Sequence, residues 1–448
     1  MLHRCLSILK LALPVMVSQI GLILVAFADN IMVGRYSTQA LASSSFVVNV
    51  FNIVIIGGLG FSYGLTPIVG ALFAGRKQGD IGRIVRVGLR ANIAVGILMS
   101  LVMGTLYFFL DRMGQPDELL PIIRPYYLIT LAGLIPLAVF NVFAQWSYGI
   151  RNTAMPMWIL LSANAVNIIG NYMLIYGNWG APEMGLTGAG ISTLTARIIA
   201  MAAIVAIFLI KRSNRTYRTG FSGHDTSDGQ KMAKVVRTSW PVALQMMFET
   251  GAFSLCAILA GWLGTVSLAA FQVIIIVGTL GFCIYYSIGT AITVQVSNDA
   301  GAKSLAACRR SAFDGYAVML FFAAISSSIF ILFGRQLMGL FSQDEAVLAV
   351  AGSVIFQLVL YQIGDATQIT FANALRGTAN VMPMLWIAFV SYVVVGLPSS
   401  YILAFPAGLG VYGILLSFSL SLFLAAALFM KAFIKTTGSK HLITLKTT

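Results

Sequence analysis

Charged residues are scarce in this sequence. Only 9% of the 448 residues are charged and 58% are hydrophobic, whereas about a quarter of the residues in ordinary soluble domains carry a charge. So few charges cannot cover a surface that faces water, which excludes a soluble globular protein. Most of the surface must therefore face lipid.

Residues that usually bind metals or perform catalysis are also few. The four cysteines are scattered without the spacing of a zinc or disulfide motif, and the three histidines (His3, His224 and His441) fall in segments that we expect to be tails or loops. The hydrophobic segments contain no Ser/His pair, His-Glu metal motif or nucleotide-binding loop. We therefore expect a protein that is not an enzyme, binds no cofactor and holds no metal other than Na⁺.

Long hydrophobic segments, by contrast, recur throughout the chain. A helix needs roughly 20 apolar residues to cross the hydrocarbon core of a bilayer. These segments predict an all-α integral membrane protein with twelve transmembrane helices. The predicted helices lie near residues 11–33, 44–74, 87–110, 126–150, 157–176, 187–210, 238–260, 271–297, 312–333, 347–375, 384–405 and 411–434.

Most of the 28 basic residues fall on one side of the predicted helices. Loops on the other side contain four of them, Arg35, Arg112, Arg124 and Arg335. Because basic residues are enriched in cytoplasmic loops, this bias accounts for the net charge of +14 without any binding of nucleic acid. It predicts a multi-pass protein of the cell (inner) membrane with both termini in the cytoplasm. We expect it to act as a monomer in the lipid bilayer.

The two halves of the sequence resemble each other. A shift of 227 residues aligns Pro14 with Pro241, and a shift of 225 aligns Arg151 with Arg376. Matches that stay in order over such a length indicate an internal duplication. The sequence therefore predicts two six-helix bundles, an N-terminal lobe (1–215) and a C-terminal lobe (238–448), joined by a polar cytoplasmic linker (216–237).

Three acidic residues, Asp29, Glu249 and Asp365, fall within predicted transmembrane helices. An ionised side chain at the centre of a bilayer costs roughly 2.5–3.5 kcal/mol or more, so such residues usually mark functional sites. In the first lobe, Asn167 and Asn171 lie one helical turn apart, and Thr193 lies at a similar depth to Asp29 by the helical rise per residue. These four residues (Asp29, Asn167, Asn171 and Thr193) predict a site for a coupling cation.

The second lobe contains a separate set of polar side chains. Gln245 and Glu249 share one face of a predicted helix, and Tyr361, Asp365 and Gln368 share a face of another. This set predicts a site that binds the coupling cation, the substrate or both. Aromatic rings stack on flat cations, and the aromatic residues that we expect near such a substrate are Phe282, Tyr285 and Tyr286.

Several segments resemble the MATE (multidrug and toxic compound extrusion) transporters, and in particular their NorM-like branch. They are Pro14 with Asp29-Asn-Ile-Met-Val-Gly34, Trp240-Pro241 with Glu249, and Tyr361, Asp365 and Gln368 followed by Leu375-Arg376-Gly377. The resemblance implies that cationic amphipathic small molecules leave the cell in exchange for Na⁺ or H⁺, by alternating access between two lobes. It also implies a role in antibiotic resistance.

Two alternatives remain open at this point. A flippase of lipid-linked saccharides can share this fold, but its anionic substrates require cationic side chains where this chain has carboxylates. A transporter of the major facilitator type is also built from six plus six helices. The sequence does not distinguish Na⁺ from H⁺ coupling, because both ions bind to carboxylate and neutral oxygen ligands.

Overall fold

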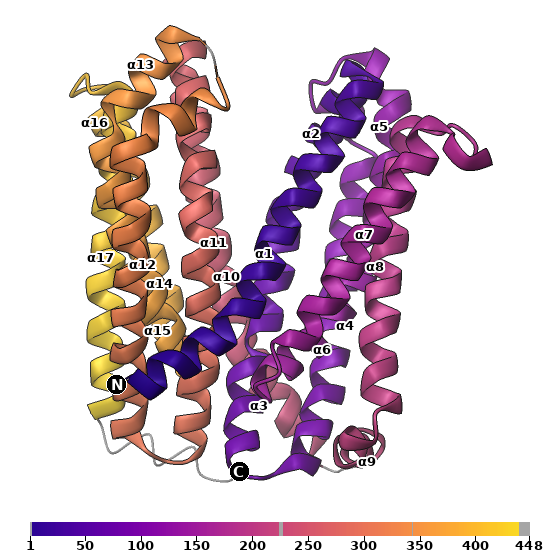
Figure 1. Ribbon diagram of the computed structural model, residues 1–448, viewed down its shortest axis with the longest axis vertical. Coiled ribbons are helices and arrows are strands. Elements are labelled where there is room, and N and C mark those ends of the chain that lie inside the picture. Colours follow the sequence, from indigo (N-terminus) through magenta and orange to yellow (C-terminus); the bar gives the residue numbers. More distant parts are fainter. Residues whose placement is uncertain (1, 224–226, 343, 439–448) are drawn as a thin grey trace. The chain divides into compact units, whose positions relative to one another are not determined.

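The described part of the chain is helical throughout. The computed structural model describes residues 2–223, 227–342 and 344–438, in which no strand occurs (Figure 1). His3 lies in the first helix rather than in a tail, whereas His224 and His441 lie outside the described residues.

The first half of the chain begins with the long helix α1 and ends with the short helix α9. Two of its spans combine consecutive α-helices, α2 with α3 and α5 with α6. The elements are α1 (Leu2–Tyr36), α2 (Thr38–Tyr63), α3 (Leu65–Ala74), α4 (Gln78–Tyr107), η1 (Leu110–Arg112), η2 (Asp117–Leu119), α5 (Leu120–Ala132), α6 (Leu134–Gly149), α7 (Ala154–Tyr176), η3 (Asn178–Gly180), α8 (Gly185–Ile210), η4 (Arg212–Asn214) and α9 (Arg215–Ser222).

The second half begins with another long helix, α10. Its penultimate span contains a π-helical stretch, η5, between two short α-helices. The elements are α10 (Asp228–Trp262), α11 (Thr265–Gly301), α12 (Leu305–Gly339), α13 (Glu345–Ser353), α14 (Ile355–Gly377), α15 (Met382–Ala388), η5 (Phe389–Gly396), α16 (Leu397–Ala404) and α17 (Gly410–Gly438).

The prediction of twelve transmembrane helices is confirmed for the described residues. Eleven helical segments are long and apolar enough to span a bilayer, and α13 with α14 forms a twelfth span that bends by 52°. The predicted helix at 347–375 missed this bend. No proline lies in this segment, but the Gly352-Ser353 pair stands directly before the break, and Gly/Ser pairs are a usual cause of helix kinks.

The chain forms two compact units, which we describe separately. Unit 1 contains Met1–Met16 and Leu244–Thr448, and unit 2 contains Val17–Ala243. Two helices therefore pass from one unit to the other. Pro14 of α1 and Pro241 of α10 each lie two residues before the change of unit. A proline inside a helix removes a backbone hydrogen bond and favours a kink, so the duplication extends to these two crossing points.

These boundaries differ from the predicted lobes at 1–215 and 238–448. Each compact unit contains the start of the first helix of the other half of the chain. In unit 1, Arg4 of α1 lies 4.0 Å from Asp314 of α12, and a side chain at Gly315 would meet Ile8. In the same unit, α14 packs against α11, α12 and α17 (Figure 1).

Much of the predicted linker is helical and belongs to unit 2. The Tyr217 ring of α9 contacts the buried Trp146 ring edge-on, with centroids 5.7 Å apart. Gly82 of α4 lies against the backbone of Tyr217, and a side chain there would collide with it. Close contact between α4 and α9 thus depends on a residue without a side chain.

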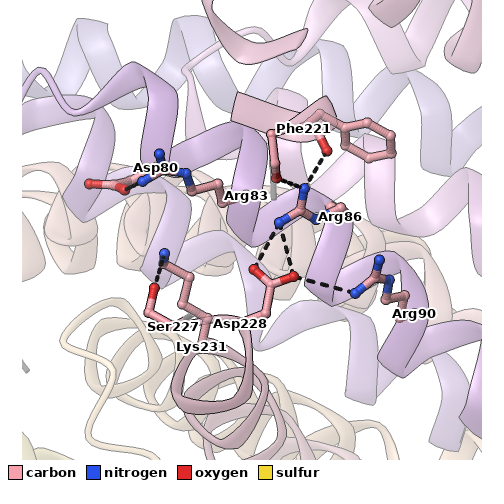
Figure 2. Close-up of polar contacts among 9 residues, drawn as sticks. Asp80, Arg83, Arg86, Arg90, Phe221, Ser227, Asp228 and Lys231 are labelled. Carbon is pink, nitrogen blue, oxygen red and sulfur yellow. Dashed lines mark hydrogen bonds and ion pairs between the residues drawn. The ribbon is translucent and has the colours of Figure 1, made fainter. Parts of the chain in front are cut away.

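An arginine fastens the linker to α4 (Figure 2). The buried Arg86 guanidinium donates hydrogen bonds to the carbonyl oxygens of Phe221 (2.9 Å) and Gly223 at the end of α9. It also donates to both carboxylate oxygens of Asp228 at the start of α10, at 2.8 and 2.9 Å. Arg90 adds a longer contact of 3.4 Å to the same carboxylate. These bonds explain why the first turns of α10 belong to unit 2.

One detail of the predicted repeat is wrong. Arg151 has a left-handed backbone (φ 64°) just after α6, and Ala379 has the same conformation (φ 59°) just after α14. The hydrogen bonds that end the two helices also correspond at a shift of 228 residues. Arg151 is therefore the counterpart of Ala379. Arg376 lies inside the last turn of α14, and its side chain is buried.

Candidate ion and substrate sites

The four polar residues predicted in the first lobe lie together in unit 2. Asn171 of α7 is fully buried, and its amide nitrogen donates a hydrogen bond to Asp29 of α1. The Asn167 amide satisfies both of its polar atoms when its nitrogen faces the same carboxylate oxygen, at 2.9 Å. Its oxygen then accepts a hydrogen bond of 3.1 Å from the hydroxyl of Thr193 on α8. The result is one carboxylate surrounded by neutral polar groups.

Close packing of α7 against α8 holds this cluster in place. The Ser192 hydroxyl donates a hydrogen bond of 2.7 Å to the carbonyl oxygen of Asn167. A side chain at Gly170 would collide with Ser192, and one at Gly188 would collide with the backbone of Leu174. Small residues at these positions allow the two helices to approach as transmembrane helices often do.

Unit 2 retains polar atoms that can bind a cation. In the part of the chain that the structure describes, the side-chain oxygen of Asn171 is buried without a hydrogen-bond partner. A buried polar atom without a partner costs free energy. The Asn171 oxygen and the Asp29 carboxylate are hard ligands of the kind that small hard cations prefer. A proton bound to Asp29 would also be compatible with these neutral polar neighbours.

The polar residues predicted in the second lobe are all found in unit 1. The Gln245 amide donates a hydrogen bond of 2.9 Å to Glu249, one turn further along α10. Asp365 and Gln368 of α14 are 2% and 1% exposed. Electrostatic interactions connect Asp365 with both Glu249 and Tyr361. Within the described residues, one oxygen each of Asp365 and Gln368 is buried without a hydrogen-bond partner.

The sequence analysis missed two members of this site. Arg376 donates hydrogen bonds to Gln245 (3.4 Å) and to Asn373 (3.2 Å). The sequence contained a signal for Arg376, because residues 365, 368, 372 and 376 lie on one face of a helix. The apparent match of Arg376 with Arg151 in the repeat concealed this signal. Tyr392 is 1% exposed in η5 and interacts electrostatically with Glu249. π-helical stretches often occur at functional sites, but hydrophobic periodicity does not reveal them.

The three aromatic residues proposed to stack on a substrate do not form one surface. Tyr285 is fully buried, and its hydroxyl is hydrogen-bonded to Ser326 of α12. Phe282 is 39% exposed and pairs with Tyr286, with ring centroids 5.9 Å apart. Any stacking surface on α11 would therefore consist of Phe282 and Tyr286.

Unit 1 has an uncharged cluster at the position equivalent to the Asp29 site. A shift of 227 residues pairs Asp29 with Cys256, and the shift of 228 pairs Asn171 with Ser399. Cys256 lies 3.4 Å from the Ser400 hydroxyl, which donates to Ser417 at 2.9 Å. Ser399 is also hydrogen-bonded to Ser417 (2.6 Å). The two units thus share a scaffold but place their carboxylates at different positions.

Duplicated bundles of apolar helices with buried carboxylates define a class of protein. Ionisable groups inside a membrane are costly, and they mark ion and substrate pathways. The fold and these two clusters are those of a membrane transporter built from two repeated lobes.

Comparison with known proteins identifies the family. The MatE family model matches residues 14–173 and 241–402, and the chain belongs to this family. It is similar to the probable multidrug resistance protein NorM of Oceanobacillus iheyensis, with 30% identity over 403 residues that cover 88% of each chain. It is also 30% identical to the probable multidrug resistance protein NorM of Bradyrhizobium diazoefficiens over 435 residues, 95% of this chain and 92% of the relative.

The fold comparison agrees with this assignment. The crystal structure of the eukaryotic MATE transporter AtDTX14 is similar to this chain with a TM-score of 0.87, over 97% of this chain and 96% of the other. The sequence identity of that pair is 18%, so the comparison concerns the fold alone.

Proposed function

We propose that this transporter exports organic cations in exchange for Na⁺ or H⁺, by alternating access of its two lobes in the cell membrane. Its substrates are cationic amphipathic small molecules. The observation that carries the proposal is the pair of carboxylates in unit 1, the half-buried Glu249 and the buried Asp365, which interact electrostatically and lie on helices with a neutral buried oxygen, that of Gln368, without a hydrogen-bond partner among the described residues. A site of this kind attracts cations and offers nothing to an anionic substrate except Arg376.

Exchange follows from competition for the same negative charges. A coupling ion neutralises the carboxylates, after which an organic cation is no longer attracted and leaves. Release of the ion restores the charge, and the next organic cation binds. Asp29 of unit 2 supplies a separate site with a single carboxylate, which suits one Na⁺ or one proton.

Movement between the two states requires flexible points in the chain. Pro14 and Pro241 lie two residues before α1 and α10 change unit. Helices bend most readily at proline, which supports movement of two compact bundles around these crossing helices.

The direct test is ethidium transport by the purified full-length chain in proteoliposomes. Transport is measured under a Na⁺ gradient alone, under a pH gradient alone, and with an ionophore that abolishes each gradient. The matched control is the Glu249→Gln/Asp365→Asn double variant, in which the shape of the site is retained and its charge is removed.

The proposal expects ethidium to move against its own gradient under at least one of the two ion gradients, and not in the control variant. Ethidium flux that follows only its own gradient, and that neither ion gradient changes, would refute exchange. Translocation of a lipid-linked saccharide without any effect of the ion gradients would favour a flippase instead.

A further inference from the structure

We propose that Arg376 is an internal counter-charge that weakens cation binding at the Glu249–Asp365 site enough for the bound cation to leave again. This inference rests on the proposed function, because it concerns the same site. Arginine stays protonated inside proteins. With both carboxylates ionised, the site therefore has a net charge of −1 with Arg376 and of −2 without it.

A hydrogen-bonded bridge connects Arg376 to Glu249. The Gln245 side chain accepts a hydrogen bond of 3.4 Å from Arg376 through its oxygen and donates one of 2.9 Å to Glu249 through its nitrogen. Gln245 is 3% exposed and Arg376 is 8% exposed. Glu249 also interacts electrostatically with Arg376. The arginine thus acts on the carboxylate through a fixed and buried geometry.

The other end of the guanidinium is held by the scaffold of unit 1. Asn373 accepts a hydrogen bond of 3.2 Å from Arg376 and another of 3.0 Å from Thr293 on α11. Its amide nitrogen donates to the carbonyl oxygen of Ile369 at 2.9 Å. A side chain with both ends fixed cannot swing out to follow a cation. Its charge is therefore present in every occupancy state of the site.

The phenols that interact with the two carboxylates in the described part of unit 1 add no charge near neutral pH. They are the phenols of Tyr285 on α11, Tyr361 on α14 and Tyr392 in η5, which interact electrostatically with Asp365 or Glu249. Phenols are neutral at that pH. The net charge of the site is therefore set by Glu249, Asp365 and Arg376.

A net charge of −1 matches the binding of one monovalent cation at a time. A site with a charge of −2 in a medium of low dielectric constant would hold the first cation tightly and would release it slowly. Removing the arginine charge should strengthen cation binding on the order of tenfold at an effective dielectric constant near 20. If Arg376 had a purely structural role, its replacement would instead weaken cation binding, because loss of the bridge would misplace Gln245 and Glu249.

The test is therefore whether replacement of Arg376 makes cation binding tighter or weaker. Na⁺ binding to the purified full-length protein is measured by isothermal titration calorimetry for the wild type, Arg376→Gln and Arg376→Lys. Proton binding is measured with a pH indicator on the same samples. Arg310→Gln is the matched control, because Arg310 is an exposed arginine of the same unit. Arg376→Met replaces Arg376→Gln if the latter does not fold, since apolar replacements of buried ionic groups are often tolerated.

We expect about tenfold tighter cation binding and slower ethidium turnover in Arg376→Gln, with values near wild type in Arg376→Lys and Arg310→Gln. Equal or weaker binding in Arg376→Gln or Arg376→Met overturns the counter-charge role. If the wild type binds neither Na⁺ nor protons at this site, the proposed function itself fails. The two failures are thus distinguishable.

Discussion

Replacement of Asp29 by asparagine should impair ion coupling far more than substrate binding. The substitution retains the shape of the side chain and its contact with Asn171, but it removes the only carboxylate among the four predicted residues of that cluster. A monovalent cation about 4 Å from a carboxylate gains roughly 4 kcal/mol at an effective dielectric constant of 20. Since every 1.4 kcal/mol is tenfold, cation binding in unit 2 should weaken by roughly a hundred- to a thousandfold.

Two measurements on the same variant test this reasoning. Ethidium efflux from proteoliposomes is followed as the coupling-ion gradient is varied, and ethidium affinity is measured by fluorescence polarisation without a gradient. The matched control is Asp111→Asn, because Asp111 is an exposed acid of the same unit whose side chain is 54% accessible. Asp29→Asn with an unchanged number of ions per ethidium and a weakened ethidium affinity would refute the assignment of Asp29 to ion coupling.

Three further predictions concern the rest of the molecule. Glu249→Gln and Asp365→Asn should each abolish gradient-driven ethidium efflux with normal expression in the membrane, and wild-type efflux in either variant would contradict the proposed site. Arg86→Met should lower the free energy of unfolding by about 3 kcal/mol because it leaves Asp228 without its main partner, whereas the exposed Arg90→Met should cost less than about 1 kcal/mol; equal shifts in thermal unfolding would argue against the Arg86 contact. Gly82→Ala should destabilise unit 2 by about 1–3 kcal/mol through its collision with α9, and Gly104→Ala in the same helix, which has open space around it, should not; similar melting temperatures for the two variants would refute this packing.

Much of the fold and of the two polar clusters could be predicted from the sequence. Hydrophobic length predicts transmembrane helices because the thickness of the bilayer is constant. The helical period places Asn167 and Asn171 on one face, and it does the same for Asp365 and Gln368. An isolated carboxylate in an apolar helix is conspicuous for its energetic cost, so the three acids stood out without any structure.

Other features depend on tertiary contacts that have no local signature. The change of unit inside α10 follows from the bonds of Arg86 to residues more than 130 positions away. The π-helical stretch around Tyr392 leaves hydrophobicity unchanged. Arg376 was paired with Arg151 because both stand in a short Arg-x-Thr match. The true correspondence follows from where the two helices end, and only the backbone conformation reveals those ends.

The exchange of helix starts between the two units bears on how such a chain arose. A half-length ancestor with this organisation would have had an incomplete unit, with the start of its first helix belonging elsewhere. Two copies could have exchanged the first segments of their first helices, so that each copy completed the other as a domain-swapped homodimer. Fusion of the two copies would then have made the partnership permanent. On this view, neither half should fold when it is expressed alone, and both should recover when they are synthesised together as separate chains.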